Sequence, residues 1–110
     1  MAATTDMQVD LTINGVTFPT AALAEICRRY GVERLSLFGS ILGDGFSEAS
    51  DVDILVEYKP DTRIGLIGMA NMEADLSEAI GRRVDLRTPG DLSHYFREKV
   101  ISNARVLHAA

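Results

Sequence analysis

The sequence predicts a single α/β or α+β domain with a small mixed β-sheet flanked by helices. Segments with helical periodicity alternate with short strand-like segments along the chain, which is typical of this class. Residues 52–57 are too continuously apolar for a strand that faces solvent, so we expect them to form a buried strand. A chain of 110 residues buries about two-thirds of the surface of its unfolded state, which suffices for one hydrophobic core.

The predicted order is a hairpin, a helix, two strands, a helix, a strand and a helix. Asn14-Gly15 lies between alternating apolar residues, the strongest short-range signal for a β-hairpin; an extended leader packed on the core is the alternative. We assign residues 1–18 to an N-terminal tail with this hairpin and residues 19–110 to the main domain. The expected helices cover residues 19–30, 65–80 and 91–107, and the expected strands cover residues 34–38, 52–57 and 83–87, with a connection over 39–50 that has room for one short helix.

The three helices are predicted from apolar residues at helical spacing and from residues typical of helix ends. Pro19 suits the first turn of the first helix, and Gly31 and Gly81 suit the positions just after the first and second helices. Asp91 is expected to cap the third helix. The residues expected on the apolar faces are Leu23, Ile26, Cys27 and Tyr30 in the first helix, Leu66, Met69, Met72, Leu76 and Ile80 in the second, and Leu92, Phe96, Val100, Ala104 and Leu107 in the third.

Composition and charge exclude several classes of protein. The net charge is −5, from 11 basic and 16 acidic residues, whereas a non-specific nucleic-acid-binding protein needs a basic face. A single cysteine, Cys27, excludes an internal disulfide and fits a reducing compartment. No apolar run approaches the length of a membrane span, and the N-terminus does not resemble a signal peptide. We therefore expect a cytoplasmic protein that binds neither membranes nor nucleic acids directly.

One spaced motif points to chemistry. Gly39-Ser40 follows a predicted strand, and Asp51 and Asp53 open the next strand after ten intervening residues. Residues two apart on a strand face the same side, so both carboxylates can bind one divalent cation or a close pair of cations. Gly39 allows the backbone to approach a phosphate, and Ser40 with the following amides can bind an anion. The motif therefore predicts a combined metal and phosphate site.

Asp85 is a candidate third carboxylate. It lies between two apolar residues of a predicted strand, and buried carboxylates are usually paired or metal-bound. If its strand lies beside that of Asp53, the site gains the third carboxylate of a two-metal arrangement that can transfer a nucleotidyl group. In the alternative interpretation Asp51 is a surface cap, and Asp53 and Asp85 form ordinary salt bridges with arginines.

The run LSLFGS…SDVDILVEYKP resembles the nucleotidyltransferase superfamily that includes the polymerase β palm. It is most similar to the minimal nucleotidyltransferases, the MntA-like antitoxins that are paired with HEPN-domain toxins. The resemblance extends over about residues 19–108 and includes the later stretches GRRVDLRTPGDL and YFREKVISNARVL. It implies a polymerase β-like nucleotidyltransferase fold.

The resemblance also implies an activity and assigns the site residues. Gly39 and Ser40 match the pair that grips the phosphates, Asp51 and Asp53 match the metal-binding pair, and Asp85 matches the third catalytic, metal-binding carboxylate. The expected cofactor is Mg²⁺, as two ions, with ATP as the substrate. The expected reaction transfers AMP to a tyrosine hydroxyl of a partner HEPN toxin and blocks its RNase activity. A chain of this length offers no second domain to shape a small-molecule acceptor pocket, which also favours a macromolecular acceptor.

The chain departs from the family pattern at one position. Relatives carry a basic residue, mostly arginine, three positions after the serine, where this chain has Gly43 followed by Asp44. A cation there can neutralise phosphate charge in the transition state, and Arg82 or Arg83 is a candidate replacement. The first hypothesis is therefore the AMP-transferring enzyme described above, and the second is a catalytically weak antitoxin that neutralises its toxin by forming a complex. The third is a structural subunit that uses the fold without nucleotide.

Overall fold

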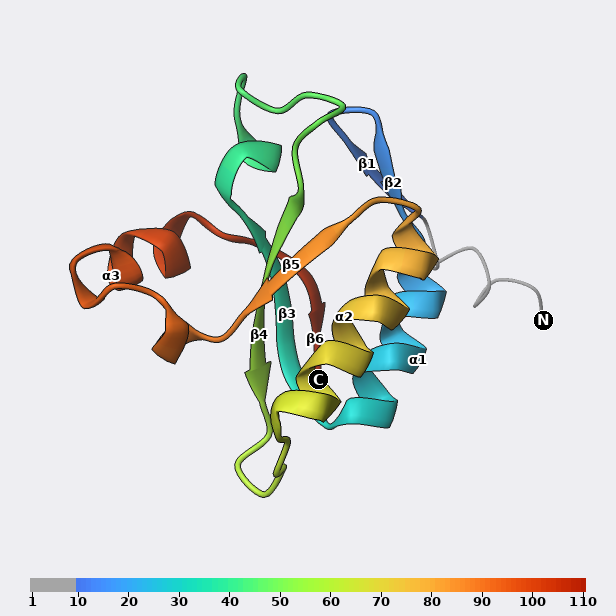
Figure 1. Ribbon diagram of the computed structural model, residues 1–110, viewed down its shortest axis with the longest axis vertical. Helices are drawn as coiled ribbons and strands as arrows, with labels where there is room; N and C mark the ends of the chain where they lie inside the picture. The colour runs from blue at the N-terminus through green and yellow to red at the C-terminus, as the bar shows by residue number, and fades with distance from the viewer. Residues whose placement is uncertain (1–9) are drawn as a thin grey trace.

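The computed structural model describes residues 10–110, so the first half of the predicted N-terminal tail lies outside the described part. The mixed α/β class is confirmed (Figure 1). The helices and strands are β1 (Leu11–Ile13), β2 (Val16–Phe18), α1 (Thr20–Tyr30), β3 (Val32–Phe38), β4 (Val52–Tyr58), α2 (Leu66–Ile80), β5 (Val84–Arg87), α3 (His94–Asn103) and β6 (Arg105–Ala109), with short 3-10 helices η2 (Gly39–Leu42) and η3 (Pro89–Asp91).

The main sheet has four strands in the order β5-β4-β3-β6. Strand β4 is antiparallel to β3 and parallel to β5, and β6 is antiparallel to β3, so the sheet is mixed as predicted. Helices α1 and α2 lie side by side on one face of the sheet, and α3 lies on the other side (Figure 1). The face under α1 and α2 carries the apolar side chains of the central strands, which form the single core.

The core contains most of the predicted apolar residues. Leu23 and Cys27 of α1 and Met72 and Leu76 of α2 are buried, and burial raises the pKa of the Cys27 thiol to about 12, which keeps it protonated. The prediction for Leu66 is wrong, because this side chain is 90% exposed. Leu66 is the first residue of α2 and lies beyond the part of that helix that the core covers. None of the helices within residues 10–110 has the length and hydropathy needed to cross a bilayer.

The predicted hairpin is confirmed, and it forms a two-stranded sheet separate from the main one. Its turn residues Asn14 and Gly15 have φ angles of 51° and 78°, as a two-residue turn of this type requires. The Asn14 side-chain amide donates hydrogen bonds to the carbonyl oxygens of Ile41 at 2.6 Å and Gly43 at 3.0 Å. The hairpin therefore fastens the connection that follows β3.

The C-terminal helix is shorter than predicted, and a sixth strand replaces its end. Helix α3 ends at Asn103, Ala104 is extended, and β6 pairs with β3. The apolar residues from Ala104 onward fit a strand as well as a helix. The exposed backbone groups along β3 decide the outcome, because β6 satisfies them through sheet hydrogen bonds.

The start of the C-terminal helix also differs from the prediction. Asp91 does not cap it: the Asp91 carboxylate accepts a hydrogen bond from the backbone N–H of Thr88 and closes η3. Phe96 is 63% exposed, and no residue of α3 is buried, so α3 itself does not enter the core. Of the predicted apolar residues, Leu107 does pack against the core, but from β6. Helix α3 instead stands over the sheet face opposite α1 and α2.

We expect the Asn14→Gly substitution to destabilise the protein by about 1–2 kcal/mol, because two side-chain hydrogen bonds are lost while glycine still adopts the left-handed φ of the turn. The free energy of unfolding in urea measures the effect. Amide hydrogen exchange at Gly43, whose N–H donates to Ser40 O at 3.0 Å, is expected to quicken. Unchanged exchange at Gly43 would show that the hairpin does not hold this connection.

Candidate active site

Gly39 lies where β3 ends and η2 begins, directly against Asp53. Its φ angle is +77°, a conformation that glycine adopts without steric cost. A Cβ atom built on Gly39 would overlap the Asp53 carboxylate. Phe38 and Asp53 are also paired residues of neighbouring strands. Both the backbone conformation and the close approach therefore require glycine at position 39.

The structure brings the three predicted carboxylates to one face of the sheet. Asp53 and Asp85 are paired residues of the parallel strands β4 and β5, and Asp51 precedes β4 by one residue. Their strand neighbours Val52 and Ile54 are buried on the opposite face, toward the core. The acidic face therefore lies away from α1 and α2, with the exposed Ser40 on the adjoining turn.

Electrostatics at Asp53 reflect this clustering. The pKa of the Asp53 carboxyl is raised, first by partial burial, then by the negative charges of Asp85 and Asp51, while Arg87 opposes the shift. Arg87 donates two hydrogen bonds to Asp85, from Nε to Oδ1 at 3.1 Å and from Nη2 to Oδ2 at 3.3 Å. Among residues 10–110, Arg87 is the arginine that pairs with this cluster, and it compensates the charge of Asp85 while leaving that of Asp53 only weakly compensated.

Within residues 10–110, no group of three or more histidine, cysteine or acidic side chains is already close enough together to hold a metal ion. The donor chemistry nevertheless suits Mg²⁺, which binds one or two carboxylates and completes its coordination with water and phosphate oxygens. The pKa of Asp53 is raised by partial burial and then by the charges of Asp85 and Asp51, and a bound cation would oppose both effects by favouring the ionised carboxylate. The carboxylates present therefore fit Mg²⁺ in their donor chemistry.

The connection before Asp51 is held by Arg82. Its guanidinium donates to the carbonyl oxygens of Ser47 at 3.0 Å and Ser50 at 2.9 Å, and it stacks over the Phe46 ring at 4.8 Å from the centroid. The sequence analysis gave Arg82 as a candidate for the cation that would neutralise phosphate charge. In the structure it fixes the chain that leads into β4, and so the start of the acidic pair.

The nucleotidyltransferase domain family matches residues 21–108 of this chain. The chain belongs to this family. Protein MJ0435 of Methanocaldococcus jannaschii, provisionally named a protein adenylyltransferase, is 30% identical over 79 residues, which are 72% of this chain and 83% of that protein. A solved structure described provisionally as a minimal nucleotidyltransferase has a TM-score of 0.64 and 31% identity, over 77% of this chain and 85% of that one.

A toxin–antitoxin structure with AMP-PNP also shares the fold. It has a TM-score of 0.64 at 21% identity, and the match covers 83% of this chain and 73% of that chain. The expected polymerase β-like nucleotidyltransferase fold is therefore confirmed. This nucleotidyltransferase places its motif glycine, its acidic pair and Asp85 around one end of the central strands.

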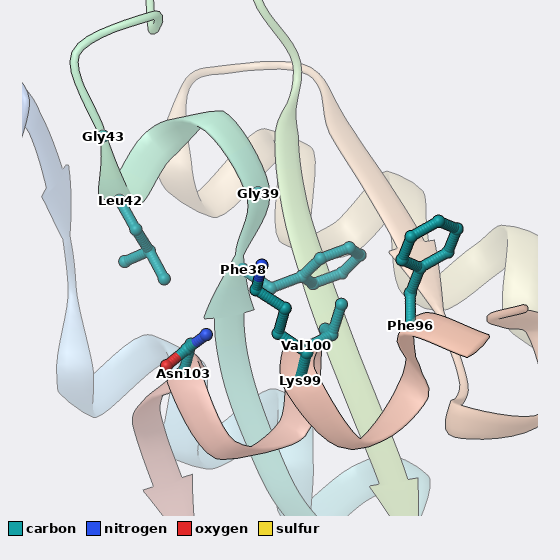
Figure 2. Close-up of a pocket in the computed structure, with 8 residues that line it drawn as sticks. All are labelled: Phe38, Gly39, Leu42, Gly43, Phe96, Lys99, Val100 and Asn103. Atoms are coloured by element: carbon teal, nitrogen blue, oxygen red, sulfur yellow. The ribbon is translucent and has the colours of Figure 1, made fainter. Parts of the chain in front are cut away.

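A pocket of about 400 Å³ adjoins the motif glycine of this nucleotidyltransferase (Figure 2). It lies between α3 and the turn after β3, and its walls are mainly apolar. Its lining residues are Phe38, Gly39, Leu42, Gly43, Phe96, Lys99, Val100 and Asn103. Sequence reasoning missed this pocket, because it depends on where α3 lies, and no local pattern in residues 94–103 specifies that position.

In a metal-free buffer with EDTA, we expect Asp53→Asn to stabilise this nucleotidyltransferase by about 0.2–1 kcal/mol. The raised pKa means that the ionised carboxylate is disfavoured in the folded state. That cost is present at neutral pH and is relieved as the pH falls through the raised pKa. The gain in the free energy of unfolding should therefore be larger at pH 7 than near pH 4.

The control is Asp61→Asn, which removes an equal charge from an exposed turn far from the site. Urea unfolding of the three proteins at both pH values separates a local effect at Asp53 from a general effect of net charge. Equal stabilisation by the two substitutions would contradict the local explanation.

Proposed function

We propose that this chain is an Mg²⁺-dependent adenylyltransferase and antitoxin that transfers AMP from ATP to a tyrosine hydroxyl of a partner HEPN toxin. The close approach of Gly39 to Asp53 carries the proposal. It puts a turn that can bind phosphate in contact with a carboxylate suited to a metal. Family membership supports nucleotidyl transfer, and the relative named a protein adenylyltransferase supports AMP and a protein acceptor.

Each site residue has a role that its position supports. Gly39 and Ser40 bind the triphosphate through backbone amides and the Ser40 hydroxyl. Asp51 and Asp53 hold Mg²⁺, with Asp85 as the third ligand on the neighbouring strand. Bound Mg²⁺ supplies charge neutralisation at the phosphates and lowers the pKa of the attacking hydroxyl.

The reaction is an in-line displacement at the α-phosphorus. The acceptor hydroxyl oxygen forms a bond to the α-phosphorus, and the bond from that phosphorus to the oxygen bridging the β-phosphorus breaks. Pyrophosphate leaves, and the hydroxyl proton passes to the carboxylate of Asp85 and then to water. Asp85 can accept it because its oxygens keep further lone pairs beyond the two hydrogen bonds from Arg87.

The acceptor is proposed to arrive on a macromolecule. The carboxylates lie on the sheet face away from α1 and α2, and Asp51 and Ser40 are exposed. A hydroxyl on the surface of another protein can therefore approach the acidic face. The toxin–antitoxin structure that shares this fold supports a toxin as that protein.

A second candidate function is neutralisation by complex formation alone. The observation that favours it is Gly43, which leaves this position of the turn without a basic side chain, where the family pattern given by the resemblance has one. A site that lacks a cation for the developing phosphate charge would catalyse slowly. The two functions differ in whether the toxin gains mass.

The test is intact-mass spectrometry of the toxin encoded beside this protein, after incubation with this chain, ATP and Mg²⁺. We expect a gain of one or more AMP units, and a loss of rate of about 10²-fold or more with Asp53→Ala, because a charge-stabilising group at the reacting phosphate is removed. The control Asp61→Ala should leave the rate unchanged. A stable complex with no mass gain would replace this proposal with the binding antitoxin.

A further inference from the structure

Lys99 is the charged residue in the pocket beside the motif glycine. It comes from the middle of α3, and its side chain rises toward Gly39 (Figure 2). It lines that pocket together with Gly39 and Gly43. The pocket's other lining residues are glycines, apolar residues and Asn103, so Lys99 alone gives this space a positive charge.

Three arginines near the site already have protein partners for their guanidinium groups. Arg87 is bound to Asp85, and Arg82 is bound to the carbonyl oxygens of the connection before β4. Arg97 donates from Nε to Pro89 O at 2.8 Å and from Nη2 to Leu92 O at 3.1 Å. Lys99 has no ion pair or side-chain hydrogen bond within residues 10–110, so its ammonium is available to a ligand.

Helix α3 is positioned so that Lys99 stays over the turn. The two hydrogen bonds of Arg97 fasten the start of α3 to the segment around η3. One residue after α3 ends, β6 begins and pairs with β3. The start of α3 is therefore tied to the segment that precedes it, and its end is tied to the sheet through β6, which limits how far Lys99 can move from Gly39.

We propose that the Lys99 ammonium binds the outer phosphates of the nucleotide, and so takes the place of the basic residue that relatives carry at position 43. The other walls of the pocket, such as Leu42 and Phe96, carry no charge that would compete with a phosphate for Lys99. This inference rests on the proposed nucleotidyltransferase function. It assigns to α3 a part of the substrate site that the spaced motif does not contain.

The first test measures binding of ATP, ADP, AMP and adenosine with Mg²⁺ by isothermal titration calorimetry. Lys59 and Lys99 are the two lysines of the chain, so Lys59→Met is the matched control for Lys99→Met. We expect Lys99→Met to weaken ATP binding by about 10- to 100-fold, as for loss of a charge-assisted hydrogen bond. Binding of AMP and adenosine should be unchanged, and Lys99→Arg should keep ATP affinity.

The outcomes separate this inference from the proposed function. If the wild-type protein binds no ATP, the proposed function fails. If it binds ATP and Lys99→Met binds equally well, the assignment of Lys99 is overturned. Equal weakening of ATP and AMP would also overturn it, because the effect would then not belong to the outer phosphates. Circular dichroism and the melting temperature of each variant identify any loss of folding.

A second test places a positive charge at position 43 in the protein that lacks Lys99. Gly43 has a φ of −132°, and a Cβ there would lie 4.0 Å from Ser40 O, an ordinary contact, so arginine fits at this position. We expect Gly43→Arg to restore the ATP affinity that Lys99→Met removes. Failure to restore it in a folded double variant would show that Lys99 does not replace a cation at position 43.

Discussion

The contact between the Gly39 backbone and the Asp53 carboxylate is the constraint on which the site depends. Any side chain at position 39 would displace that carboxylate, and the φ of +77° would strain any residue other than glycine. The register of β3 and β4 fixes the contact, since Phe38 lies opposite Asp53. A turn that can bind phosphate and a carboxylate that can bind a cation are thus held together by sheet pairing rather than by side-chain hydrogen bonds.

The connection around this contact is held by segments that are distant in sequence. Asn14 of the hairpin donates hydrogen bonds to one carbonyl group within η2 and to that of Gly43 just after it, and Arg82 donates to carbonyl groups shortly before Asp51. The hairpin was predicted from Asn14-Gly15, but its contact with the connection after β3 was not. A turn signal in the sequence does not show what the side chain of a turn residue contacts. The hairpin holds the connection beside the site, although it does not join the main sheet.

Most of the fold could be predicted, because the strands and the first two helices have recognisable local patterns of apolar residues. The acidic residues of the candidate site could be named from the spaced motif. The patterns of apolar residues predicted strands β1 to β5 and helices α1 and α2. The sequence left open whether the strand of Asp85 lies beside that of Asp53, and the register of β4 and β5 shows that it does. The end of α3 could not be predicted in the same way. Residues from Ala104 onward suit either a helix or a strand, and the open edge of β3 decides between them. The position of Lys99 depends on where α3 ends and β6 begins, so it could not be predicted from the sequence either.

The charges of the site explain why a cation must come from outside the spaced motif. Asp53 carries a raised pKa because it is partly buried beside Asp85 and Asp51, and Arg87 offsets only part of that charge. A triphosphate adds further negative charge to a chain whose net charge is already −5. Mg²⁺ held by the carboxylates would neutralise part of this charge, and a protein cation near the turn would neutralise more of it. A lysine on α3 is well placed for this role, because it lines the pocket beside the motif glycine.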